Sequence, residues 1–172
     1  PHTGWRPPGE GDMHLVVGAR ADIAPPDTPL ALTPATAESL PRVQAAYRAA
    51  LEARPDLAPH LSPIDADDLG ALIDGGSALD AWEGSAWVGL IAAEPAALLG
   101  AAGWLIVEEI LAPAFRGRGL GAHLQRAGVT RLPARNAPLV WGTIHSDNQP
   151  SLRCAARVGR QSVDLRWLVP IS

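Results

Sequence analysis

Residues 111–125 read LAPAFRGRGLGAHLQ, and the chemistry of this stretch comes from its glycines and arginines. Arg116 and Arg118 alternate with Gly117, Gly119 and Gly121 between an apolar run and a helix-like run. Glycine lets the backbone turn sharply or approach a ligand closely. Main-chain N–H groups at the start of a helix, with positive side chains beside them, suit an anion. The stretch therefore predicts a cradle for a phosphate group.

The composition of the 172-residue chain excludes several classes of protein. All fourteen basic residues are arginine, which excludes a Walker phosphate loop and a pyridoxal-phosphate Schiff base, since both need a lysine. The net charge of −4 argues against a nucleic-acid partner. The single cysteine excludes an internal disulfide and a thiolate zinc site. With no membrane-spanning run and no signal-peptide pattern, a cytoplasmic location is expected.

A second informative stretch, IHSDNQPSLRCAARVGR at 144–160, follows the first by about thirty residues. Here an apolar strand ends, Asn148 follows, and a short helix with an early proline ends at Gly159. The first stretch has the spacing R-x-x-G-x-G at Arg116, Gly119 and Gly121 rather than the dinucleotide spacing G-x-G-x-x-G. Together the two stretches resemble the acyl-CoA-binding motifs of the GCN5-related N-acetyltransferases, the GNAT superfamily.

The resemblance implies that acetyl-CoA binds as the acyl donor. The five histidines are scattered without the spacing of metal ligands, so no metal is expected. In this superfamily the strand before the glycine loop splays from its neighbour, and its main chain pairs with the pantetheine arm. The N–H groups of the loop then wrap the pyrophosphate. The cofactor-binding residues implied here are Glu109, Ile110, Leu111, Arg116, Gly117, Arg118, Gly119, Leu120, Gly121, Ala122, Asn148 and Ser151.

The implied reaction is direct attack of a primary amine on the acetyl thioester. The main-chain N–H of Leu111 takes the family's position for stabilising the oxyanion. The amine must lose a proton, and the candidate bases are Glu108, Glu109 and His145, acting directly or through water. Alternation along a strand directs the two glutamates to opposite faces, so at most one of them faces the cleft. Many relatives protonate the leaving thiolate with a tyrosine, and Ala155 stands at that position.

Two functions follow from this pattern. The first is an acetyltransferase that modifies a small amine or a peptide N-terminus. The second is a catalytically silent CoA-binding or regulatory domain, which the alanine at the tyrosine position favours. The sequence names no acceptor, because acceptor loops vary freely on one fold.

The order of the strands and helices expected around these residues predicts an α/β domain. Strands are expected at 29–33, 78–93 (a hairpin turning at 83–85), 103–111, 137–145 and 163–170. Helices are expected at 36–54, from 62 to Gly75, from Leu120, and in the second motif, with Thr36 and Ser62 as the first two N-caps. The resemblance implies one GNAT-type domain over 29–172, with a mixed, splayed sheet and about four flanking helices.

Residues 1–28 form a Pro- and Gly-rich arm interrupted by one apolar run. Relatives often close the sheet with a hairpin after the last helix, yet the residues after Gly159 suffice for one strand only. We therefore expect Met13–Val17 to add a strand, either in the same chain or by exchange with a second copy. Exchange would make a homodimer.

Overall fold

The structure is a computed structural model that describes residues 12–27, 30–61, 63–133 and 137–167. The strands of the described residues are β1 (Asp12–Ala19), β2 (Ala31–Pro34), β3 (Ala78–Glu83), β4 (Ala86–Leu98), β5 (Ala101–Leu111), β6 (Leu139–His145) and β7 (Gln161–Trp167). The α-helices are α1 (Ser39–Ala53), α2 (Ala66–Asp74), α3 (Leu120–Arg131) and α4 (Gln149–Arg157). The predicted α/β fold with a mixed sheet is confirmed. No helix in these ranges is long and apolar enough to cross a membrane.

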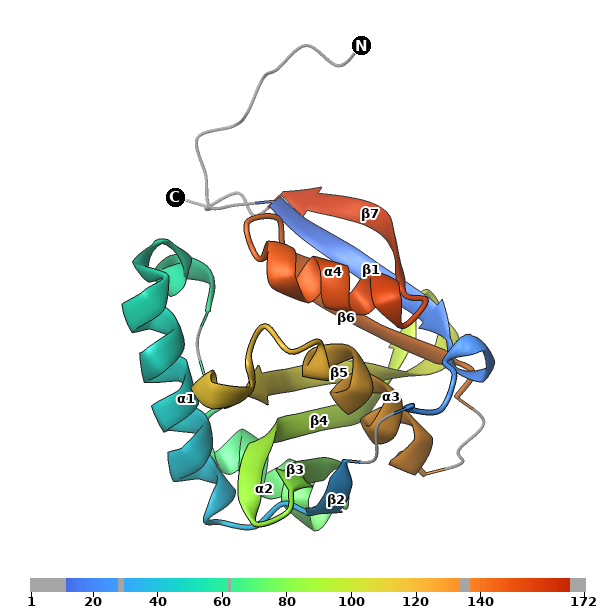
Figure 1. Cartoon of the computed structure of the whole chain (residues 1–172). Coiled ribbons are helices and arrows are strands. Elements are labelled where there is room, and N and C mark those ends of the chain that lie inside the picture. Colours follow the sequence, from blue (N-terminus) through green and yellow to red (C-terminus); the bar gives the residue numbers. More distant parts are fainter. Residues whose placement is uncertain (1–11, 28–29, 62, 134–136, 168–172) are drawn as a thin grey trace.

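The strands form one sheet in the order β2-β3-β4-β5-β6-β1-β7 (Figure 1). β5 and β6 run parallel, whereas every other neighbouring pair is antiparallel. The parallel pair is joined by the glycine loop and α3, as a parallel connection requires a crossover. The glycine loop therefore lies at the end of β5 in the middle of the sheet.

Strand β1 contains the apolar run Met13–Val17 and lies inside the sheet. It pairs with β6 on one side and with β7 on the other, within the same chain. Leu15 and Val16 are 3% and 2% exposed, so the strand contributes to the core. β7 is the one described strand after α4, and β1 occupies the position beside it. Association with a second copy stays a prediction.

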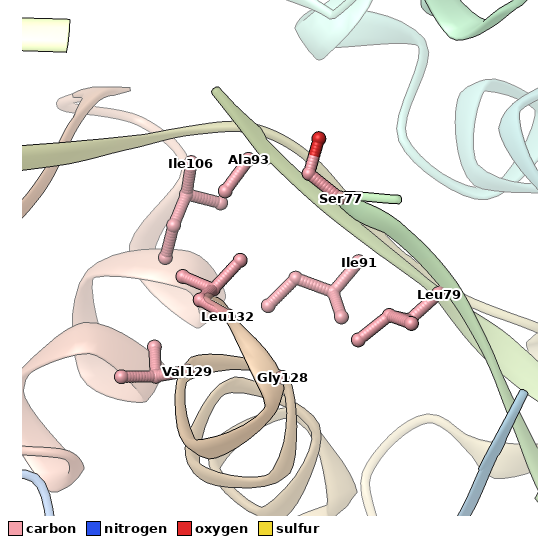
Figure 2. A pocket seen from close by; sticks show the side chains of 8 residues that line it. All are labelled: Ser77, Leu79, Ile91, Ala93, Ile106, Gly128, Val129 and Leu132. Carbon is pink, nitrogen blue, oxygen red and sulfur yellow. The ribbon is translucent and has the colours of Figure 1, made fainter. Parts of the chain in front are cut away.

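The helices cover both faces of the sheet. α1 and α2 pack their apolar side chains on one face, around Leu90 and Ile110. α3 packs on the other face through Leu120 and Leu124, and α4 lies beside α3 (Figure 1). A Cβ at Gly128 would lie 2.7 Å from Cγ2 of Ile91, so glycine permits the close approach of α3 to the sheet. Figure 2 shows the mostly apolar side chains that line the hollow between them. The hollow has no room for water, so it serves packing.

Two helices begin later than the sequence predicts. Thr36 does not cap α1: Ser39 Oγ accepts a hydrogen bond from the Thr36 N–H and donates to the buried Asp80 carboxylate, at 2.9 and 2.6 Å. This buried contact fixes the start of the helix at Ser39. The second predicted cap, Ser62, lies outside the described residues. Asp65 is the N-cap of α2, and its side chain accepts from the Asp68 N–H at 2.8 Å.

Candidate functional site

The site begins where β5 and β6 separate. The two strands pair only between Gly103–Leu105 and Leu139–Trp141, and beyond these residues they diverge (Figure 1). On its other side β5 stays paired with β4 as far as Leu111, with a register shift that leaves Val107 as an extra residue. Such a bulge bends a strand and increases its twist. The carboxyl end of β5 therefore has one unpaired edge.

The unpaired edge presents main-chain groups of Glu109 and Leu111. The Ala112 N–H donates to the Val88 carbonyl at 2.9 Å, and hydrogen-bonded pairs alternate along an antiparallel ladder. Ile110 therefore bonds to β4, whereas the N–H and C=O groups of Glu109 and Leu111 point away from it. The Leu111 carbonyl accepts from Arg116 Nε, and an extended ligand arm can pair with the other groups as an additional strand would.

The glycine loop connects β5 to α3 with a left-handed backbone. Gly117 and Gly119 have φ angles of +75° and +79°, and Gly119 is the N-cap residue of α3. Residues with side chains rarely adopt this conformation. The turn leaves the N–H groups of the first turn of α3 without helical partners, and the helix dipole adds partial positive charge there. The loop thus has the geometry of an anion site.

The end of β5, the glycine loop, α1 with the segment after it, and α4 together line a cleft of about 520 Å³. Eleven of the twelve cofactor-binding residues expected from the sequence line it: Glu109, Ile110, Leu111, Arg116, Gly117, Gly119, Leu120, Gly121, Ala122, Asn148 and Ser151. Asn148 is the N-cap of α4, and its Oδ1 accepts from the Ser151 N–H. The structure therefore brings the two sequence motifs to one cavity.

The two loop arginines make contacts within the protein. Arg116 donates from Nε to the Leu111 carbonyl and from Nη2 to the Ala46 carbonyl, at 3.0 and 2.9 Å. It thereby ties the loop to β5 and α1. Arg118 does not line the cleft: its guanidinium lies over the Phe115 ring and pairs with Glu83 at 3.0 Å.

Three other arginines, which were not predicted from the sequence, line the cleft. Arg54 forms an exposed ion pair with Asp56 at 2.6 Å. Arg153 and Arg157, one helical turn apart on α4, are exposed at the rim of the cleft. Their spacing of four residues on a predicted helix was a signal that could have found them, because such residues share a face.

Glu108 points to the face covered by α1, and it is not among the residues that line the cleft. The residue is 3% exposed, and its carboxylate accepts from the Tyr47 hydroxyl at 2.7 Å and from the Ile64 N–H at 3.2 Å. Burial raises the pKa of Glu108, while hydrogen bonds from Tyr47, Ile64 and the Glu109 main chain oppose that rise. Burial and the neighbouring carboxylate raise the pKa of Tyr47 as well, so its hydroxyl stays protonated and donates.

Glu109 points to the opposite face, as strand alternation predicts. Its Oε2 accepts from Gln125 Nε2 at 2.6 Å, and Cys154 Sγ lies 3.6 Å from Oε1. Arg160 Nη1 donates to Gln125 Oε1 at 3.2 Å, which extends the polar cluster below α3. This cluster was not predicted from the sequence. Burial raises the pKa of Glu109 to about 7, although the Arg160 charge and the hydrogen bonds from Gln125 and Cys154 act in the other direction.

The remaining candidate base, His145, is likewise not among the residues that line the cleft. It is 5% exposed at the end of β6, and its Nδ1 accepts from the Asp147 N–H at 3.1 Å. Ala155 is fully buried in α4. In the part of the chain that the structure describes, no group of three or more His, Cys, Asp and Glu residues could hold a metal ion.

Comparison with known proteins assigns this arrangement to a family. The model of the acetyltransferase (GNAT) family matches residues 43–159. No curated protein sequence matches the chain. Among solved structures, a GNAT acetyltransferase from Colwellia psychrerythraea shares 15% identity over 92% of this chain and 55% of its own, with a TM-score of 0.59.

Two further structures have the same fold. A Drosophila protein shares 19% identity over 94% of this chain and 52% of its own, with a TM-score of 0.66. Naa50 of Arabidopsis thaliana, in complex with the bisubstrate analogue CoA-Ac-MVNAL, shares 15% identity over 80% of this chain and 86% of its own, with a TM-score of 0.58. At sequence identities this low, the similarity to these structures shows a shared fold and nothing more. The chain spans about half the length of the Drosophila and Colwellia proteins.

Proposed function

Because the chain belongs to the GNAT family of acetyltransferases, whose model matches residues 43–159, we propose that it transfers an acetyl group from acetyl-CoA to a primary amine. The observation that carries the proposal is the cleft itself. It joins an unpaired strand edge to a left-handed glycine loop at a helix start. An extended arm that ends in a diphosphate fits both parts at once.

The residues of the chain have separate roles in this proposal. The main chain of Glu109 and Leu111 pairs with the pantetheine arm, and the N–H groups of 117–122 bind the diphosphate. The Leu111 N–H polarises the thioester carbonyl and stabilises the oxyanion that forms on attack. Acetyl-CoA supplies an activated acyl group, so the chain needs to orient it and remove a proton from the amine.

Glu108 is the base we favour, acting through water. It lies on the strand face covered by α1, where Tyr47 and the Ile64 N–H fix its carboxylate. A raised pKa brings a carboxylate closer to the proton affinity that general-base catalysis needs. Cys154 does not serve as an acyl-accepting nucleophile, since burial raises the pKa of its thiol. Direct attack by the amine is therefore the favoured route.

The departing thiolate has no tyrosine to protonate it, because Ala155 is buried at that position. A thiol with a pKa near 8.5 leaves without full protonation at neutral pH. The same alanine supports the second candidate, a CoA-binding domain that is catalytically silent. Release of CoA thiol in the presence of small amines and peptides with free N-termini separates the two candidates. The peptide-containing analogue bound by Naa50 is the reason to include peptides in this panel.

Acetyl-CoA is expected to stabilise the folded protein. A ligand that binds only the folded state adds RT ln(1 + [L]/Kd), or about 2.7 kcal/mol at a hundredfold excess over Kd. Differential scanning calorimetry measures the resulting rise in melting temperature. An unchanged melting temperature at millimolar acetyl-CoA, with no heat of binding in titration calorimetry, contradicts the proposal. Free pantetheine, which lacks the diphosphate, is the control and is expected to shift the melting temperature less.

Arg153 and Arg157 are expected to contact the 3′-phosphate of the cofactor at the rim of the cleft. Neither side chain makes an ion pair with a described residue. Replacing both by alanine is expected to lower CoA affinity by roughly tenfold, since partly exposed charge pairs contribute about 1 kcal/mol or less each. Titration with dephospho-CoA is the control. Equal losses for the two ligands would place the arginines away from the 3′-phosphate.

A further inference from the structure

The carboxyl group of Glu109 lies directly below the start of α3. A Cβ at Gly121, in the first turn of that helix, would lie 3.5 Å from Glu109 Oε1. Gln125 holds the other oxygen at 2.6 Å from the same helix. Part of the residue reaches the cleft, while α3 and α4 enclose its carboxyl group. The acidic side chain of Glu109 thus lies beneath a loop whose geometry suits an anion.

Few positive charges lie near Glu109 to balance its negative charge when the carboxyl group is ionised. Arg160, which follows α4, is the nearest opposite charge, but its guanidinium donates to Gln125 Oε1 and to the Val16 carbonyl. From α4, the Cys154 thiol faces the carboxyl group in its protonated form, because burial raises its pKa. From β5, the Glu108 carboxylate adds repulsion. Burial outweighs the attraction to Arg160, and the pKa of Glu109 rises to about 7.

We propose that Glu109 takes up a proton when the diphosphate of the cofactor binds at the glycine loop, so that cofactor affinity falls as the solution becomes alkaline. The inference rests on the proposed function, because it takes the diphosphate to lie at the first turn of α3. It assigns Glu109 a second role besides its main-chain contact. The side chain becomes a determinant of cofactor affinity that depends on pH.

Coulomb's law gives the size of the effect. One unit charge about 7 Å from a carboxylate, at an effective dielectric constant near 20, raises the carboxyl pKa by between one and two units. The diphosphate therefore favours neutral Glu109, and the bound complex keeps the proton to a higher pH than the free protein does. Midway between the free and bound pKa values, a rise of one to two units makes binding take up about 0.5–0.8 of a proton.

The direction of the pH dependence follows from this difference. Below about pH 6, Glu109 is neutral in both the free and the bound protein, so its titration does not change the affinity. Above about pH 7 the free protein is ionised and must gain a proton to bind. The affinity then falls by up to about tenfold for each pH unit, until the pH reaches the bound-state pKa.

Titration calorimetry with dephospho-CoA tests the proposal. This ligand lacks the 3′-phosphate, whose own titration near pH 6 would add a proton change unrelated to Glu109. Binding measured at about pH 6.5, 7.5 and 8.5, in buffers of different ionisation enthalpy, gives the number of protons taken up. We expect uptake of about 0.4–0.8 of a proton at pH 8, and an affinity roughly tenfold lower at pH 8.5 than at pH 6.5.

Two variants complete the test. Glu109→Gln has the shape of the neutral side chain, so we expect it to abolish proton uptake and to bind more tightly than wild type at pH 8.5. Glu83→Gln is the matched control, since Glu83 is an exposed carboxylate that pairs with Arg118 of the same loop. We expect Glu83→Gln to leave the proton uptake unchanged.

Each result decides the proposal. Wild-type binding without proton uptake overturns it, and this measurement does not depend on how well any variant folds. Proton uptake that persists in Glu109→Gln, or that disappears in Glu83→Gln, assigns the proton to another group and also overturns it. If dephospho-CoA and CoA give no heat of binding at any pH, the proposed function fails instead, and the two failures are distinct.

Discussion

Replacing Gly119 by Asp is expected to lower acetyl-CoA affinity by a factor of roughly 10²–10³ while the protein stays folded. Gly119 has a φ of +79°, a conformation that Asp and Asn tolerate better than other residues with side chains. A Cβ there has no protein atom within 4 Å, so the carboxylate enters open space at the loop. It would meet the diphosphate at close range, and an acidic group at a helix start does not destabilise the helix.

Gly119→Asn is the matched control, because its side chain has the same shape without the charge. The difference in affinity between the two variants measures electrostatic repulsion at the loop, free of steric effects. Titration calorimetry gives both affinities, and circular dichroism with melting curves confirms that both variants fold. Native folding with wild-type affinity in Gly119→Asp would mean that the loop is only a connection between β5 and α3.

The sequence predicts the parts of the site that depend on local chemistry. Arg116, Gly119 and Gly121 mark the turn between β5 and α3, and Asn148 with Pro150 marks the start of α4. These signals are local because turns and helix starts depend on a few adjacent residues. The family resemblance then predicts that the two motifs lie at one binding site. Alternation along β5 correctly predicts that Glu108 and Glu109 face opposite ways.

Features that depend on contacts between distant residues could not be predicted in the same way. Thr36 has the chemistry of an N-cap, but the contact of Ser39 with Asp80, 41 residues away, decides where α1 begins. The bulge at Val107 depends on pairing with β4. Glutamine and arginine usually lie on protein surfaces. Only the packing of α3 and α4 on β5 buries Gln125 and Arg160 around Glu109.

The position of β1 in the sheet likewise could not be predicted from local sequence. The apolar content of 13–17 indicates a strand. It does not indicate that the strand enters between β6 and β7 with both edges paired. Register across a sheet is fixed by the partner strands, and these lie far away in the sequence.

Replacing Glu108 by Gln is expected to lower kcat/KM for the amine by a factor of roughly 10²–10⁴, the usual contribution of a general base. Acetyl-CoA affinity is expected to stay near the wild-type value, because the Glu108 side chain faces α1 rather than the glycine loop. Single-turnover acetylation together with titration calorimetry separates the two quantities. A variant that binds acetyl-CoA normally and retains the full rate would assign the proton transfer to another group.

Tyr47→Phe tests the same role through the pKa of Glu108. The hydrogen bond from Tyr47 lowers this pKa against the effect of burial, so its removal raises the pKa further. A base acts only when it is ionised, and its ionised fraction falls as the pH drops below its pKa. The acid limb of the kcat/KM profile is therefore expected to move to higher pH in Tyr47→Phe, with the rate recovering at alkaline pH. A uniform loss of rate at every pH would mean that Tyr47 only supports packing, and an unchanged profile would exclude Glu108 as the base.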